Sequence, residues 1–548
     1  MLFSNIIRFG ILSCLGVVLV ESSWAAKPDS KKPSAGQTAD KKTVPVTFKP
    51  IQQVGKISAK DLANKIDAEI NKLLTQGKIT PSGKSSDSEF VRRVYLDLIG
   101  RIPSADETKS FLDNTASNKR TLLIEELLAD DEFGKHMADI WQALLLPRIS
   151  DNKRLKTEPL VEWLEGEFNK NTSWGKISRE LISSTGSQDN NGAVTYFVAN
   201  STIDKMTDSI SRLFLGVQLQ CAQCHNHPFV DWKQNEYWGM AAFFMKVQAN
   251  PPKGKDTSAP VVNENKSVKR NKKNALPESA QMVNAKFPGD VEPKLPSDGP
   301  YRPVFADWMT SKTNPFFSKS MVNRIWSQFF GRGLVDPIDD MHDGNPATHP
   351  ELLEILSQQF SASDFDIKDL IRAICNSDTY QRSSKPNDSN KNAEKELLAS
   401  MPIKNFTPEQ LYDSIMTVVG NPTKNEIKAA KMKKLKITSR GPRSQFVTFF
   451  QPEEGVSALS YETGIPQVLR LMNSPQMNSS QTIAKIISKD MDSTKAINTL
   501  FLSTLNRLPT DSEIQKLSTF VKDAGDPKQG YSDILWVLLN TSEFTLNH

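Results

Sequence analysis

Apolar side chains recur every three or four residues along most of this chain, in segments that begin and end at helix-capping residues. In the first such segment, Ser58 precedes Leu62 and Ile66, and Gly77 follows. This spacing places the apolar side chains on one face of a helix. Only residues 193–198 favour a strand, so the sequence predicts a mainly α protein. Further helices are expected at residues 90–98, 122–128, 133–146, 159–168, 177–183, 305–310, 319–330, 350–360, 367–376, 408–419, 465–472, 481–488, 493–505, 511–524 and 531–539.

The composition narrows the class of protein without naming a function. Hydrophobic residues make up 38% and charged residues 24% of the 548 residues, which excludes a wholly disordered chain. Four cysteines exclude a disulfide-dense scaffold. The net charge of +5 comes from 68 Lys+Arg and 63 Asp+Glu spread along the chain. No concentrated basic surface is therefore expected, and a nucleic-acid partner is not predicted.

Residues 1–25 have the pattern of a secretory signal peptide. Arg8 supplies the positive charge, residues 9–20 form an apolar run, and small residues stand at Ser23 and Ala25 before the expected cleavage site. The alternative is an uncleaved membrane anchor, although the apolar run is short for a spanning helix. The protein is therefore expected to be exported to the periplasm or cell surface, with no transmembrane span after cleavage.

Changes in composition divide the rest of the chain. Residues 26–56, rich in Lys, Pro, Ser and Thr, are interpreted as a flexible basic tether. A first helical domain is expected at 57–248. A Pro- and Lys-rich linker follows at 249–300, with a short extended piece at 281–287, and a second helical domain is expected at 301–548.

An internal repeat suggests a duplicated helix-turn-helix module. Arg-Ile-Pro-Ser-Ala-Asp-Glu at 101–107 matches Arg-Leu-Pro-Thr-Asp-Ser-Glu at 507–513, and Leu-Leu-x-x-x-Glu-Phe follows at 127–133 and 538–544. In each copy the proline is expected in a turn, the Ser or Thr is expected to cap the next helix, and the final Phe is expected to be buried. These residues are Pro103, Ser104 and Phe133 in the first copy, and Pro509, Thr510 and Phe544 in the second.

The motif Cys221-Ala-Gln-Cys224-His225 is the strongest candidate for chemistry. Its spacing is that of c-type haem attachment, in which two thiols bind the porphyrin and the imidazole becomes an axial iron ligand. Three alternatives stay open: a Cys221–Cys224 disulfide, a packed structural cluster, or a Zn²⁺ site that uses both thiols with His225 or His227. Cys375 lies on an apolar helix and is expected to be a buried, inert thiol.

A second polar cluster occupies residues 339–349. Asp339, Asp340 and His349 could hold a divalent cation or serve as acid and base. The alternative is a connecting loop whose Asp residues cap neighbouring helices. Arg324 lies on an apolar helix, and it is expected to pair with Asp339 or Asp340 because an unpaired buried charge is costly.

Several motifs resemble a pair of protein domains from planctomycetes. Residues 213–218, 221–229 and 237–244 are similar to the planctomycete cytochrome-associated domain, domain of unknown function fifteen-forty-nine. The second half of the chain resembles its usual partner, domain of unknown function fifteen-fifty-three. The segments that carry this second resemblance are 314–315, 323–326, 330–335, 339–340, 349–353, 380–384 and 536–544.

The resemblance implies an exported protein whose family has no established activity. Relatives often carry a separate cytochrome c module ahead of the pair, and some carry a lectin-like module between the two domains. Residues 27–56 are too few for a cytochrome, and residues 249–300 are too few for a lectin sandwich. The lectin-like modules associate the family with polysaccharide or the cell surface by analogy only.

Three functional hypotheses follow, and none decides whether the protein is an enzyme. The first is a c-type haem protein that exchanges electrons with a redox partner. The second is a non-haem binding or scaffold protein associated with the cell surface or its polysaccharide, with a disulfide in the motif. The third is a metal-dependent hydrolase that uses Cys221, Cys224 and His227, or Asp339, Asp340 and His349.

Overall fold

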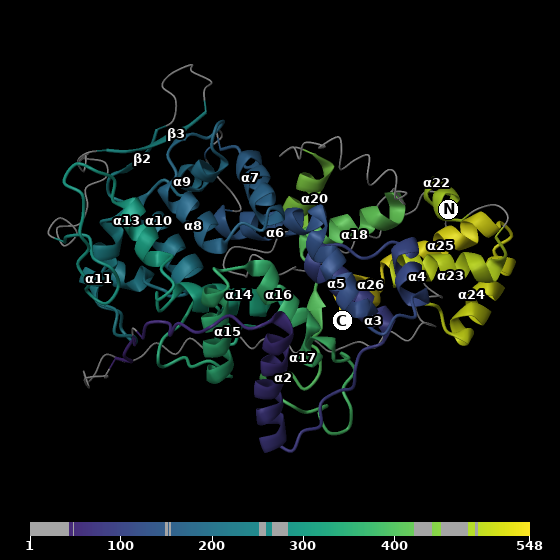
Figure 1. The fold of residues 1–548 in the computed structure, drawn as a ribbon. Coiled ribbons are helices and arrows are strands. Elements are labelled where there is room, and N and C mark those ends of the chain that lie inside the picture. Colours follow the sequence, from purple (N-terminus) through teal and green to yellow (C-terminus); the bar gives the residue numbers. More distant parts are fainter. Residues whose placement is uncertain are drawn as a thin grey trace, which may run out of the picture.

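The computed structural model confirms a mainly α-helical protein with little sheet (Figure 1). It describes residues 43–47, 49–147, 152, 155–250, 259–265, 283–420, 441–450, 480–487 and 491–548. None of the helices in these ranges is long and apolar enough to cross a membrane. The helix expected at 465–472 lies outside the described residues.

The first half contains α2 to α11, and the second half contains α13 to α26. The helices of the first half are α2 (Ala59–Gln76), α3 (Asp87–Ile99), α4 (Ala105–Asp113), α5 (Lys119–Ala129), α6 (Asp131–Leu145), α7 (Glu158–Asn169), α8 (Trp174–Ser183), α9 (Thr195–Ala199), α10 (Ile203–Ile210) and α11 (Gln234–Ala241). Shorter helical turns are η1 (Gly192–Val194), η2 (Ser211–Leu215) and η3 (Gln220–Gln223). The helices of the second half are α13 (Arg302–Met309), α14 (Phe317–Phe330), α15 (Pro350–Ala362), α16 (Ile367–Asn376), α17 (Asp378–Gln381), α18 (Pro408–Gly420), α20 (Pro442–Phe450), α22 (Ser480–Ile486), α23 (Ser493–Thr504), α24 (Asp511–Asp523), α25 (Pro527–Leu539) and α26 (Ser542–Thr545), with a 3₁₀ turn η5 (Lys395–Leu397).

The strand expected at 193–198 is wrong, because these residues form η1 and α9 instead. Their side chains are almost all buried, and an apolar run buried on every side has no alternation that would separate a strand from a short helix. Asn191 caps the turn by accepting a hydrogen bond from the Ala193 backbone N–H at 3.1 Å. This local cap favours the helical turn over an extended chain.

Strands occur where the sequence analysis placed a linker. Strand β3 (Val261–Glu264) pairs antiparallel with β2 (Val247–Asn250) and with β1 (Gly186–Ser187), in the order β1-β3-β2. Glu264 at the end of β3 forms an ion pair with the fully buried Arg302 at 2.9 Å. The described parts of residues 249–300 therefore pack into the fold, while the position of a domain boundary stays a prediction.

The apolar side chains form two cores that meet at α3. The first core draws on residues between 62 and 401, and the second on residues between 406 and 544 together with Leu96 and Ile102. In Figure 1, α3 lies between the helices around α8 and the group α23–α25. Since α3 supplies side chains to both cores, it is the structural link between them.

Two consecutive arginines on α3 reach toward different cores. Arg92 donates to Asn506 Oδ1 at 2.8 Å and to the carbonyl oxygen of Thr504 at 3.0 Å, on the side of the second core. Arg93 donates to the Tyr380 carbonyl at 2.7 Å, on the side of the first core. Both side chains are fully buried. Successive residues of a helix point about 100° apart, which allows neighbours to serve different surroundings.

The internal repeat is present as two helix-turn-helix joints with the predicted caps. Ser104 begins α4 and Thr510 begins α24, and each forms a reciprocal capping box with the Glu three residues later. Both prolines of the repeat lie in the loop before the new helix. Phe133 is 1% exposed and Phe544 is fully buried, as predicted.

The two joints also share one ionic arrangement. Arg101 pairs with Glu107 at 2.9 Å and with Glu132 at 2.8 Å. In the second copy, Arg507 pairs with Glu513 at 2.9 Å and with Glu543 at 2.6 Å. The second glutamate of each set comes from the Leu-Leu-x-x-x-Glu-Phe motif. Each arginine therefore joins the two halves of its own repeat.

Candidate functional site

The first motif thiol, Cys221, lies on the 3₁₀ turn η3, and the second, Cys224, follows directly after it. Cys221 and Cys224 are both exposed, whereas Ala222 between them is fully buried. A 3₁₀ helix has three residues per turn, so side chains three positions apart lie on the same side. Both thiols are free, and no disulfide joins the cysteines of the described residues. Cys375 is buried, as predicted. The turn therefore presents two thiols to one side of the surface.

Helix α11 holds this turn by its carbonyl groups. Gln234 Nε2 donates to the Cys224 carbonyl at 2.8 Å and to the Gln223 carbonyl at 3.1 Å. Trp238 Nε1 donates to the same Gln223 carbonyl at 3.1 Å. A short turn leaves its last carbonyl groups without helical partners, and α11 satisfies them. Helix α11 therefore fixes the backbone of the turn, while the two thiols stay exposed.

His225 of the motif and the neighbouring His227 use their Nδ1 atoms in opposite ways. His225 is exposed, and its Nδ1 lies 2.7 Å from the Asn226 carbonyl oxygen. A carbonyl oxygen only accepts hydrogen bonds, so Nδ1 carries the proton and Nε2 keeps a free lone pair. His227 Nδ1 instead accepts the N–H groups of Phe229 at 3.2 Å and Val230 at 3.0 Å. His225 can therefore bind a metal through Nε2, whereas His227 holds the following loop.

The structure brings the two polar clusters of the sequence next to each other. The Met341 backbone N–H donates to the Gly216 carbonyl at 2.9 Å, which joins the 339–349 loop to the segment before η3. Burial lowers the pKa of His227, and the nearby Asp340 carboxylate opposes this shift. The turn that carries the two thiols, residues 220–224, is called the thiol turn below. The thiol turn and the 339–349 loop thus form one surface region built from both halves of the chain.

Asp339 pairs with Arg212, and the partner expected for Arg324 is wrong. Asp339 accepts from Arg212 Nε at 2.7 Å and from Gln218 Nε2 at 3.0 Å. Arg324 makes no ion pair with either aspartate in the described residues, and it donates to the Arg212 carbonyl at 3.2 Å. Burial lowers its pKa to about 10, and the Asp339 charge opposes that shift. Arg212 therefore neutralises Asp339 by direct contact, and the Asp339 charge affects only the pKa of Arg324, without contact.

His349 lies apart from the aspartates with which it was grouped. It is 3% exposed at the start of α15, with Nδ1 3.1 Å from Thr348 Oγ1 and no partner for Nε2. Burial lowers its pKa, and the carboxylates that oppose this are Glu69 and Glu351. Within the described residues, no three His, Cys, Asp or Glu side chains are grouped as a metal site would require. The metal ligands suggested by the sequence stay predictions.

A buried pair, Asp208 and Tyr237, lies between α10 and α11 and was missed by the sequence analysis. The Tyr237 hydroxyl and Asp208 Oδ1 are both buried without a well-formed hydrogen bond. Burial raises the pKa of Asp208 to about 6, and the neighbouring Asp204 charge adds to the shift. Asp208 occupies an ordinary position on an amphipathic helix, so only the packing of α10 against α11 distinguishes it.

Asp208 gives a testable dependence of stability on pH. Because the folded protein binds the proton more tightly than the unfolded chain, stability should fall as pH rises from the ordinary carboxyl value of 3.8 through about 6. Asp208→Asn should flatten this part of the profile and raise the melting temperature at neutral pH. Melting curves at several pH values measure it. Asp189→Asn, at an exposed carboxylate, should leave the slope in place. An unchanged slope in Asp208→Asn would contradict the prediction.

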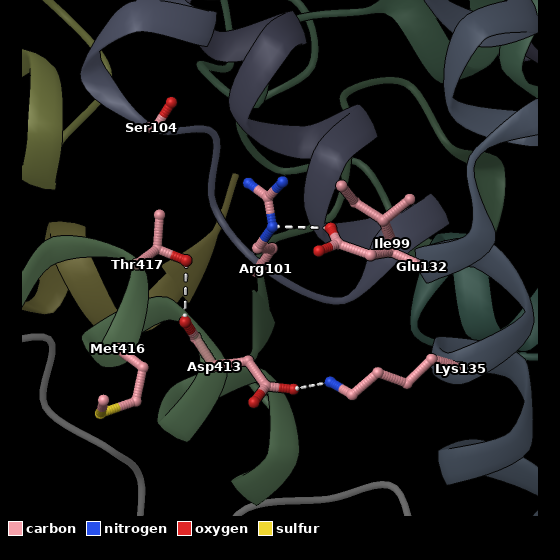
Figure 2. A pocket seen from close by; sticks show the side chains of 8 residues that line it. All are labelled: Ile99, Arg101, Ser104, Glu132, Lys135, Asp413, Met416 and Thr417. Atoms are coloured by element: carbon pink, nitrogen blue, oxygen red, sulfur yellow. Dashed lines mark hydrogen bonds and ion pairs between the residues drawn. The ribbon is translucent and has the colours of Figure 1, made fainter. Parts of the chain in front are cut away.

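A separate cavity of about 170 Å³ lies at the first helix-turn-helix joint (Figure 2). Its charged walls are two ion pairs, Arg101 with Glu132 at 2.8 Å and Lys135 with Asp413 at 2.6 Å. Figure 2 shows each pair pointing toward its own partner along the wall. Each of these four charges is therefore paired within the protein.

These features define a mainly helical protein with an exposed Cys-x-x-Cys-His turn beside a polar loop from its second half. Comparison with family models then identifies the two halves. Residues 65–249 match PSCyt2, a protein of unknown function (DUF1549), the planctomycete cytochrome-associated domain. Residues 301–521 match PSD1, a protein of unknown function (DUF1553).

The chain therefore carries both paired domains that its motifs resemble. The thiol turn lies in the first match and the 339–349 loop in the second. No curated protein is significantly similar to the chain. No solved structure is significantly similar to it either.

Proposed function

We propose that this protein is exported and carries a covalent c-type haem on Cys221 and Cys224, with His225 as an axial ligand. The observation that supports this most is the tautomer of His225. Its Nδ1 proton is held by the Asn226 carbonyl at 2.7 Å, so Nε2 is the free nitrogen, and it stands beside two exposed thiols. A bound haem would supply reversible one-electron chemistry.

The residues around the turn have defined roles in this proposal. Gln234 and Trp238 fix the carbonyl groups of the turn, which keeps the two thiols at one spacing. His227 is engaged by two backbone N–H groups, so it does not compete with His225 for the iron. Because the turn is exposed, a redox partner could approach it directly. The signal-like residues 1–25 support export to a compartment where such haem is attached.

The test is expression with a cytochrome c maturation system, followed by an absorption spectrum and an intact mass. The expected result is a Soret band and the added mass of one haem that survives denaturation. Cys221→Ser with Cys224→Ser should abolish both. Cys375→Ala is the matched control, since that thiol is buried far from the motif in sequence, and it should retain the haem.

Two results would overturn the haem assignment. A colourless protein whose mass is lower by two hydrogens would favour a Cys221–Cys224 disulfide, and with it a non-haem binding or scaffold protein at the cell surface. A colourless protein that holds stoichiometric zinc, lost in the double cysteine variant, would favour a metal site. Both outcomes require that a known cytochrome matures in the same cells.

A further inference from the structure

One segment contacts both halves of the protein. It consists of residues 43–47 and 49–57 and precedes both family matches. The sequence analysis placed most of them in a flexible tether, but Ile51 is only 2% exposed. The Ile51 backbone N–H donates to the Thr313 carbonyl at 3.2 Å, and Gln53 Nε2 donates to the Lys312 carbonyl at 2.8 Å. This part of the segment is therefore anchored on the second half.

The beginning of the same segment is paired with the loop that follows the thiol turn. The Val44 backbone N–H donates to the Phe229 carbonyl at 2.9 Å, and the Val44 carbonyl accepts the Asp231 N–H at 2.7 Å. Together they form a parallel bridge between Val44 and Val230. Thr43 Oγ1 adds a hydrogen bond to Asp231 at 3.2 Å. The bridge begins two residues after His227.

Val44 also contacts the 339–349 loop on its other side. A Cβ atom on Gly344 would lie 2.8 Å from Val44 Cγ1 and 3.0 Å from Val44 Cγ2, closer than real Cβ contacts. The methyl groups of Val44 therefore occupy the space that a side chain at 344 would need. The Thr47 hydroxyl donates to the Asp343 carboxylate three residues further along the segment. One short stretch thus contacts a loop of each half.

We propose that residues 43–47 and 49–57 are a clamp that fastens the 225–231 loop to the 339–345 loop, and that its first residues can release to free both. The two ends differ in strength. The later end carries the buried Ile51, the Ile57 hydrogen bond to Gln359 at 3.0 Å and the Lys56–Asp369 ion pair at 3.0 Å. At the early end, Thr43 and Thr47 are exposed and Val44 is half-buried.

Local opening is favoured where few apolar contacts and solvent-exposed hydrogen bonds hold a segment. Release should therefore start at residues 43–47 while the end near Ile51 stays docked. This would make the loop that carries His227 and the polar loop of the second half mobile together. The clamp is thus a conformational device at the thiol turn, and it does not depend on what the turn binds.

The test is hydrogen–deuterium exchange on the full chain with a double-mutant cycle at the closest contact. Gly344→Ala should push Val44 away and raise exchange several-fold in both 225–231 and 341–345. Val44→Ala should raise it less, because the bridge is a backbone contact. In the Val44→Ala background, Gly344→Ala should add little, since the atoms that it meets at 2.8 and 3.0 Å are gone and, of its three nearest atoms, His342 Nδ1 at 3.1 Å is the one left.

Exchange in α6 and α25 monitors the fold and should not change in any variant. Equal exchange of the 225–231 loop in wild type and Gly344→Ala would overturn the proposal. So would a full additional effect of Gly344→Ala in the Val44→Ala background, because Val44 would then not mediate it. Wild type and variants are compared in the same haem state, so failure of this proposal is separate from failure of the proposed function.

Discussion

Replacing Asp97 by Ala is expected to lower the free energy of unfolding by about 3–5 kcal/mol, because it leaves a buried ammonium group unpaired. Asp97 Oδ1 accepts from Lys404 Nζ at 2.7 Å and from Asn547 Nδ2 at 2.7 Å. Its Oδ2 accepts from the Tyr380 hydroxyl at 2.8 Å. Asp97 is 4% exposed, so water cannot easily replace the carboxylate. Three donors from distant parts of the chain thus depend on one side chain.

Guanidinium denaturation followed by circular dichroism measures this loss. Asp97→Asn keeps one acceptor oxygen but removes the charge, so an intermediate loss is expected. The matched control is Asp388→Ala, at a fully exposed carboxylate, which should leave the midpoint unchanged. Lys404 Nζ also donates to the carbonyls of Gln328 at 2.9 Å and Phe329 at 2.7 Å. A wild-type midpoint for Asp97→Ala would show that these carbonyls are enough for the ammonium group and would contradict the prediction.

Arg92→Met should cost about 2–4 kcal/mol, because it leaves several buried acceptors without a donor. Arg92 Nη1 donates to Thr504 O and Asn506 Oδ1, and Nη2 donates to the carbonyls of Glu543 at 3.1 Å and Phe544 at 2.5 Å. The methionine fills similar space and relieves the cost of burying the charge, which offsets part of the loss. Burial lowers the pKa of Arg92 to about 9, so the native side chain is still charged at neutral pH.

The same denaturation experiment tests Arg92, with two further variants for comparison. Arg92→Lys keeps the charge, but a single ammonium group cannot reach four separated acceptors, so it should also lose stability. Arg179→Met removes an exposed arginine and should have little effect, since exposed ion pairs contribute little. If Arg92→Met is as stable as wild type, the hydrogen bonds to the second core contribute nothing net.

The helices and their caps could be predicted because the information is local. Ser58, Ser104 and Thr510 each accept a hydrogen bond from a backbone N–H three residues later in the structure, as their sequence context indicates. The repeat was visible for the same reason, since both copies conserve the cap, the proline and the apolar face between them. At residues 193–198, where burial is complete, the local signal fails.

The candidate site could be predicted as a motif but not as an arrangement. The spacing of Cys221, Cys224 and His225 indicates their chemistry, but the tautomer of His225 depends on the Asn226 carbonyl and therefore on the backbone of the turn. The charge pairs were harder to predict, because Asp339 is neutralised by Arg212, 127 positions earlier in the chain. Composition gave no sign of this pairing.

The clamp was also missed, because its structure depends on contacts with distant parts of the chain. The sequence analysis treats residues 26–56 as one flexible tether, although their last part contains Val44, Val46, Ile51 and Val54. Their order comes from the loops to which they bind, at 229–231 and 343–344. A segment that is ordered only by contacts with distant loops has no helical or strand periodicity, so sequence analysis predicts a linker there.

The two consecutive arginines of α3 also determine how the molecule can move. A hinge between the two cores would have to pass beside this helix, since both cores take side chains from it. Arg92 and Arg93 stand on one rigid backbone, so a tilt of α3 that relaxes the bonds on one side strains those on the other. The hydrogen bonds of the two arginines therefore hold α3 in one orientation relative to both cores.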